Sequence, residues 1–165
     1  MVVETEVSVY HFFQKELVFL QSLIGGARHQ EMLQQLAMGD CELRGLRRAL
    51  VDRFDGGNGR DALMLAVIYA AASGQIILDS DRVQVGKLTK REAEIFARLA
   101  EGYRSPAIAE HVGVHKHAIE ARLENVFAKL GVLNRFEAAA LIHQRIRQSG
   151  GKLTILEVIG SSTNP

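Results

Sequence analysis

Residues 88–146 restrict the fold of this chain more than any other segment, because apolar residues recur there at helical spacing between glycines. Three successive runs each place their apolar residues on one face of a helix. Thr89 precedes Glu92 by three residues, the spacing of a capping box at a helix N-terminus. Gly102 and Gly113 follow the first two runs, where a residue free to adopt positive φ can end a helix. The segment therefore predicts a bundle of short helices.

Only a short turn separates the second and third of these helices. Ser105, with Pro106 at the first helical position, opens the second helix, and the third is expected from about His115 to Leu130. Two helices joined this closely form a helix-turn-helix, whose second helix lies in a DNA major groove with its N-terminal half at the base edges. A fourth helix, over residues 136–146, is expected to pack behind the pair.

This segment resembles the LuxR-type (GerE or NarL-like) DNA-binding domain of bacterial transcription regulators. The matching residues are LT.RE.EI at 88–95, LAEG at 99–102, IAEH at 108–111, the AIEAR after the turn, KLGV at 129–132 and NRFEAA at 134–139. The resemblance implies a four-helix DNA-binding domain whose third helix reads the groove and whose last helix often serves dimer contact. We therefore expect a LuxR-type helix-turn-helix domain over residues 88–149.

The third helix departs from the family pattern at the positions that meet DNA. Where the family typically has Ser and then Thr-Val-Lys, with a further polar or basic residue one turn on, this chain has His115, Ala118, Ile119, Glu120 and Glu124. Glu120 and Glu124 are one helical turn apart on the face expected to meet phosphates. A carboxylate there lowers DNA affinity unless it accepts a hydrogen bond from a cytosine N4 amine.

Ten residues around the turn and the third helix are candidates for DNA contact. Lys116 and His117 are the best of them because they stand at the exposed start of the reading helix, and Glu120 is a candidate for selecting cytosine. The alternative is that most of these side chains only solvate a helical surface. Residues 88–149 hold 10 basic and 7 acidic residues, against 9 and 11 in residues 1–87. The candidates are Arg104, Ser105, His115, Lys116, His117, Glu120, Ala121, Arg122, Glu124 and Lys129.

Residues 1–74 are expected to form a helical module for dimerisation or partner binding, with helices at about 9–24, 28–38, 40–54 and 60–73. Asp40 is expected to cap the third of these helices. The wide apolar face of the first helix suits either a core or a dimer interface. Residues 75–87 form a connector, and 150–165 a tail whose run 152–159 adds a strand or covers the N-terminal helices. The expected dimer contacts are Phe13, Leu17, Leu20, Ala139, Ile142 and His143.

The composition, 47% apolar and 24% charged over 165 residues, is that of a soluble globular protein. The lone Cys41 is expected to be a small buried or half-buried hydrophobe. Neither a signal segment nor a spanning apolar run is visible, so we expect a cytoplasmic protein without membrane contact. His111, His115 and His117 lack the spacing of a zinc site, and no catalytic constellation stands out. We therefore expect no enzyme activity, no cofactor and no metal.

The sequence as a whole predicts a mostly α protein, in which an N-terminal helical module precedes a four-helix LuxR-type helix-turn-helix domain. The expected function is that of a dimeric regulator of transcription that binds double-stranded DNA. The alternative is a non-enzymatic interaction factor, an anti-activator or adaptor, that keeps the helix-turn-helix fold, has lost general DNA affinity and binds another transcription regulator.

Overall fold

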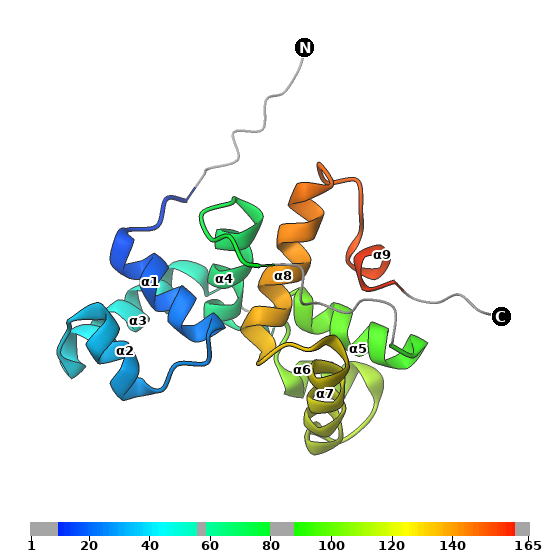
Figure 1. The fold of residues 1–165 in the computed structure, drawn as a ribbon. Coiled ribbons are helices and arrows are strands. Elements are labelled where there is room, and N and C mark those ends of the chain that lie inside the picture. The colour runs from blue at the N-terminus through cyan, green and yellow to red at the C-terminus, as the bar shows by residue number, and fades with distance from the viewer. Residues whose placement is uncertain (1–9, 56–58, 80–87, 161–165) are drawn as a thin grey trace, which may run out of the picture.

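The computed structural model describes residues 10–55, 59–79 and 88–160, and the regular secondary structure of these residues is α-helical (Figure 1). This confirms the predicted mostly α class. Residues 1–9, 56–58 and 161–165 and most of the predicted connector over 75–87 lie outside the described residues. The helices are α1 (Gln14–Ile24), α2 (His29–Leu36), α3 (Asp40–Phe54), α4 (Ala62–Ala72), α5 (Lys90–Ala100), α6 (Ser105–Val112), α7 (Lys116–Leu130), α8 (Arg135–Gln148) and α9 (Ile155–Ile159).

Side chains at the helix starts explain several of these boundaries. The predicted capping box of α5 is present: Thr89 Oγ1 accepts from the Glu92 N–H at 3.3 Å, and the Glu92 carboxylate accepts from the Thr89 N–H at 2.8 Å. The prediction that Asp40 caps α3 is wrong, because Gly39 is the N-cap and its N–H donates to the Glu42 carboxylate. The Asp40 carboxylate instead pairs with His29 and Arg44.

Helix α6 starts one residue earlier than predicted. Arg104 is the N-cap, with an extended backbone (ψ 152°), so Ser105 is the first helical residue and Pro106 the second. Helix α6 ends at Gly113, whose φ of 73° confirms the predicted left-handed turn.

Helix α8 lies in the middle of the molecule, between α1–α4 on one side and α5, α7 and α9 on the other (Figure 1). Ala140 is fully buried in a core built from α1, α2, α3 and α4, and Phe136 packs against the same core. Leu141 and Ile142 are buried in a second core with α5, α7 and α9. Small side chains along α8 allow this close approach on both sides. One helix of the predicted helix-turn-helix domain therefore belongs to both cores.

A second junction joins the residues before α4 to the turn between α5 and α6. The Asp61 N–H donates to Gly102 O at 2.8 Å, and the Arg104 N–H donates to Gly59 O at 2.9 Å. Gly102 has a φ of 92°, and a Cβ at this position would lie 2.9 Å from Leu65 Cδ2. The N-terminal part thus holds the turn from which α6 begins.

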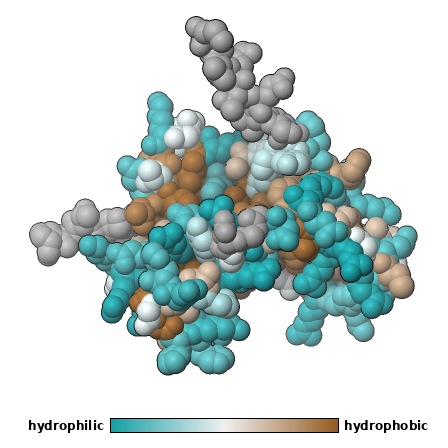
Figure 2. All heavy atoms as spheres, turned by 180° about the vertical axis from the view of Figure 1, so that it is seen from behind, coloured by the Kyte–Doolittle hydropathy of each residue, from teal (hydrophilic) through white to brown (hydrophobic). Residues whose placement is uncertain are grey.

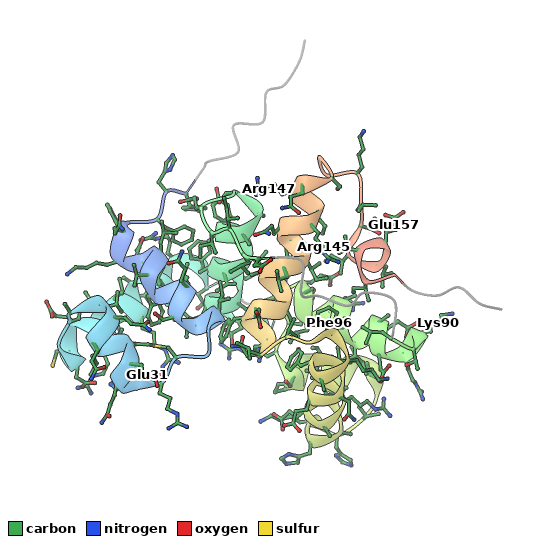
Figure 3. All side chains as sticks on the ribbon, viewed as in Figure 1. Glu31, Lys90, Phe96, Arg145, Arg147 and Glu157 are labelled. Carbon is green, nitrogen blue, oxygen red and sulfur yellow. The ribbon has the colours of Figure 1, made fainter. Side chains whose placement is uncertain are left out.

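The C-terminal run 152–159 follows neither of the two predicted alternatives. Thr154 and Glu157 form a capping box, so the run becomes the short helix α9 rather than a strand (Figure 3). Val158 and Ile159 are buried in the core with α5 and α8, so α9 covers the helix-turn-helix side instead of the N-terminal helices. Seen from behind, hydrophobic residues gather on the side of the molecule where α8 and α9 lie (Figure 2). Leu153, before α9, and Leu156, within it, are exposed.

Two side chains of the N-terminal helices have a degree of burial that their residue types do not indicate. Cys41 is exposed at the second position of α3 and is not the buried hydrophobe that was predicted. Glu16 is 97% buried within the first helix, where its carboxylate accepts from Arg53 Nη2 at 2.5 Å, from Arg53 Nη1 at 3.2 Å and from the Phe13 N–H at 2.8 Å. This ion pair ties α1 to α3.

In the described part of the chain, no helix is long and apolar enough to cross a membrane.

Candidate nucleic-acid interface

Helices α6 and α7 form the predicted helix-turn-helix. The apolar side of α7, with Ile119, Leu123 and Val126, is buried in the core shared with α5 and α8. Phe96, on α5, is fully buried in the same core (Figure 3). Because one side of α7 is fixed in this way, its opposite side faces solvent along the length of the helix.

The start of α7 presents three basic side chains to solvent. His115 is the N-cap, and Lys116 and His117 follow it, with the His117 side chain 93% exposed. Glu120, one turn later, pairs with two of them: its Oε1 lies 3.3 Å from Lys116 Nζ and its Oε2 lies 3.3 Å from His117 Nδ1. Its carboxylate therefore offsets part of the positive charge at the start of α7. Glu124 is exposed on the next turn.

The remaining candidates on α7 are less available. Lys129 Nζ donates to both oxygens of Glu92, at 2.6 and 2.8 Å, and this bond is the main reason that the pKa of Glu92 lies below its usual value. Arg122 is half-buried, and its Nη1 is buried with no hydrogen-bond partner among the described residues. Ala121 is exposed. Lys129 would have to leave its ion pair to reach a phosphate.

A second basic cluster surrounds Tyr103, in the turn before α6. The guanidinium of Arg60 lies 5.0 Å from the centroid of the Tyr103 ring, and that of Arg98 lies 5.7 Å from it. Arg135, the first residue of α8, donates from Nη2 to Tyr103 O at 3.2 Å. Arg104 is exposed beside them at the N-cap of α6. The start of α6 therefore carries several arginines around a helix N-terminus, which favours anions.

Burial affects the pKa of Arg135 and the accessibility of Ser105, which both lie near Arg104. Burial lowers the pKa of Arg135 from its usual value, with Arg104 acting in the same direction and Asp61 against it. The Nε of Arg135 has no hydrogen-bond partner among the described residues. The Ser105 side chain is 93% buried, so this candidate faces the protein rather than solvent.

Arg60 and Arg98 are not among the candidates predicted from the sequence. Arg60 precedes Tyr103 by 43 residues, and only the backbone pairing of residues 59–61 with 102–104 brings the two together. No local pattern marks this contact. Arg98 is half-buried in the last turn of α5, where its guanidinium lies near Glu101 and His111 as well as Tyr103.

The predicted dimer contacts are mostly inside the chain. Phe13 is 74% exposed and Leu17 is half-buried, whereas Leu20, Ala139 and Ile142 are buried within one copy. His143 is partly buried and donates from Nε2 to Ala100 O at 2.7 Å; burial lowers its pKa, against the weaker opposite effects of Ala100 O and Glu101. The buried contacts are available to a second copy only if the surrounding helices move. Dimerisation stays a prediction.

The clustered histidines of the sequence do not converge on a metal site. His111 Nε2 lies 3.1 Å from Arg98 Nη2, and His117 pairs with Glu120. Within residues 10–55, 59–79 and 88–160, no group of three His, Cys, Asp or Glu side chains is placed to hold a metal ion.

Comparisons with known proteins agree with this geometry. The sequence model of the bacterial regulatory proteins of the luxR family matches residues 86–142. Over 85 residues the chain is 34% identical to the probable transcriptional regulatory protein SgaR of Hyphomicrobium methylovorum. This match covers 48% of this chain and 40% of that protein. Over 59 residues it is 34% identical to the transcriptional regulatory protein YdfI of Bacillus subtilis (strain 168), covering 36% of this chain and 28% of that protein.

The matches confirm the predicted LuxR-type domain and leave much of the chain unassigned. The matched part of this chain spans less than half the length of either curated relative. The family match does not include residues 1–85, and no solved structure matches the chain.

Proposed function

We propose that this chain is a DNA-binding regulator of transcription, because its residues 86–142 form a LuxR-family helix-turn-helix domain. The observation that carries the proposal is the exposed start of α7, where His115, Lys116 and His117 face solvent at the N-terminus of the helix that a helix-turn-helix inserts into DNA. Its role is regulatory rather than catalytic.

In the proposed complex, α7 lies in the major groove and its first turn meets the base edges. Lys116 and His117 are the direct readers, and Glu120 accepts from a cytosine N4 amine when its two ion pairs open. Arg104, exposed at the N-cap of α6, holds a phosphate, which fixes the register of α7 in the groove. Two copies on half-sites about 34 Å apart would match one turn of DNA.

A specific observation also favours a second function. Glu120 offsets the charge of Lys116 and His117, Lys129 is held by Glu92, and Glu124 adds an exposed carboxylate. A reading helix with so little free positive charge suits a protein surface better than a phosphate backbone. The alternative is therefore an anti-activator or adaptor that binds another transcription regulator through this domain.

Fluorescence anisotropy with mixed genomic duplexes, between about 50 and about 300 mM salt, separates the two functions. A DNA-binding regulator binds with an affinity that falls steeply with salt. Arg104→Gln, which removes the proposed phosphate contact at the N-cap of α6, should then make the log–log salt slope shallower by about one unit. The matched control is Lys90→Gln at the exposed start of α5 (Figure 3), which should leave that slope unchanged.

The alternative is tested with Glu120→Lys combined with Glu124→Lys. If the unchanged chain fails to bind at the lowest salt and the double-lysine chain binds, the fold serves a protein partner. Glu94→Lys on α5 adds the same kind of charge away from α7 and controls for a general gain in basicity. DNA binding by the unchanged chain overturns the alternative. If neither the unchanged chain nor the double-lysine chain binds DNA, the primary proposal is wrong.

A further inference from the structure

A cavity of about 290 Å³ lies in the N-terminal part of the chain, outside the nucleic-acid interface. Its walls come from α1, α2 and α3, with one residue each from α4 and α8. Six of its nine lining side chains are apolar, among them Phe19, Met32 and Leu43, which are at least 92% buried. The volume is near the lower end of the range for small-molecule sites, about 300–1,000 Å³.

The remaining three lining residues are basic, and none is acidic. His29 Nε2 lies 2.7 Å from Asp40 Oδ1, and Arg44 pairs with the other oxygen of the same carboxylate. Arg47, one turn after Arg44 on α3, is exposed and has no ion-pair or hydrogen-bond partner among the described residues. The lining therefore carries two guanidinium groups and no carboxylate, and Arg44 but not Arg47 is paired with the nearby Asp40. An anion can accept from Arg47 without breaking either bond of Asp40.

We propose that this cavity binds a small organic carboxylate with an apolar body. The apolar walls exclude a ligand that is polar throughout, since its buried polar groups would stay unpaired. A guanidinium matches the planar geometry of a carboxylate and forms two parallel hydrogen bonds with it. The body of the ligand lies against Phe19, Met32 and Leu43, and its carboxylate is held by Arg47, with Arg44 adjacent.

The cavity also touches the start of α8. Phe136 lines it from α8 and Leu23 lines it from the end of α1. Between them, Asn134 Nδ2 donates to Leu23 O at 3.1 Å and to Ile24 O at 3.0 Å. The next residue, Arg135, donates to Tyr103 O at the start of α6. Occupancy of the cavity would thus bear on DNA binding; this link rests on the proposed function, whereas binding of the carboxylate does not.

Binding is tested first without DNA. Because the chain contains no tryptophan, Phe136→Trp places a single fluorescent reporter in the cavity wall. Octanoate and phenylacetate are titrated against 1-octanol and 2-phenylethanol, which have the same bodies without the charge. At least one acid should bind about tenfold or more tightly than its alcohol, since the alcohol lacks the charge-assisted bonds. Calorimetry on the unchanged chain repeats the measurement without the reporter.

Two arginines on the same helix provide the matched pair of variants. Arg47→Gln should weaken the acid about tenfold, while Arg48→Gln, an equally exposed neighbour that does not line the cavity, should leave it unchanged. The proposal is overturned if neither acid binds better than its alcohol, or if the two variants behave alike. Anisotropy with and without the acid then tests only the link to DNA, so a chain that binds the acid but no DNA refutes the proposed function alone.

Discussion

Asn134 connects the start of α8 to the end of α1, and replacing it tests how much each set of its hydrogen bonds stabilises the fold. Its side-chain oxygen accepts from the Phe136 N–H at 2.8 Å and the Glu137 N–H at 3.0 Å, which caps α8. Its amide group donates to the carbonyls of Leu23 and Ile24 at the end of α1. Asn134→Ser keeps a hydroxyl that can cap α8 and loses the bonds to α1. Asn134→Ala loses both.

The contacts set the size of each effect. Losing the cap costs about 1 kcal/mol. Leu23 O retains the bond from the Gly26 N–H at 3.1 Å, so only Ile24 O relies on Asn134 among the protein groups near it. Asn134 is half-buried, so a carbonyl that loses its bond can pair with water from the solvent side, which puts the loss of the bonds to α1 at about 1 kcal/mol. We expect Asn134→Ser to lower the free energy of unfolding by about 1 kcal/mol and Asn134→Ala by about 2 kcal/mol.

Urea unfolding followed by far-ultraviolet circular dichroism measures both variants, because the chain has no tryptophan. Asn125→Ser, on the exposed face of α7, is the control and should stay within about 0.5 kcal/mol of the unchanged chain. If serine and alanine at position 134 cost the same, the cap contributes nothing. If serine costs less than about 0.5 kcal/mol, the bonds to α1 contribute nothing and the reasoning fails.

Further variants test three other features of the fold by the same unfolding measurement. Gly102→Ala should lower the free energy of unfolding by about 1–2 kcal/mol because its φ is 92°, whereas Gly45→Ala, in the open interior of α3, should raise it by about 0.5–1 kcal/mol. Arg53→Met should cost about 2–4 kcal/mol because it leaves the carboxylate of Glu16 buried, and adding Glu16→Leu should restore most of the loss. Burial lowers the folded pKa of His143, so stability should fall as the pH drops below the unfolded value of about 6.5, and His143→Gln should remove this dependence.

Each of these expectations can be contradicted. Equal effects at the two glycines would mean that the turn before α6 is not constrained. A double variant as unstable as Arg53→Met alone would mean that the loss reflects packing rather than the unpaired carboxylate. A pH dependence that persists in His143→Gln would belong to another group.

The helix-turn-helix could be predicted because its signals are local. Thr89 and Glu92 are three residues apart, and Gly113 directly follows the helix it ends, so each acts within one turn of the chain. The role of α8 in two cores could not be predicted, since the alanines that pack on either side of it give no directional pattern. The contact between Arg60 and Tyr103 depends on chain pairing over long range.

Two errors at helix starts have different causes. Asp40 is a favoured N-cap residue, yet its carboxylate is drawn to His29 and Arg44 and a glycine takes the cap position. Thr154 and Glu157 repeat the spacing of Thr89 and Glu92, and the same rule applied to both would have predicted α9. The competition of His29 and Arg44 for the Asp40 carboxylate cannot be read from the sequence. The spacing of Thr154 and Glu157 can be read from it.

The position of α8 also limits how freely the helix-turn-helix domain of this chain can be exchanged between proteins. A fragment starting at residue 88 would keep α5–α9 but expose the face of α8 that carries Phe136 and Ala140. Such a fragment would have either to cover that face with another protein or to pair with a second copy through it. A recombination event that replaced the N-terminal helices would therefore have to supply a surface complementary to α8. We therefore expect the helix-turn-helix domain and the N-terminal helices of this chain to change together in evolution.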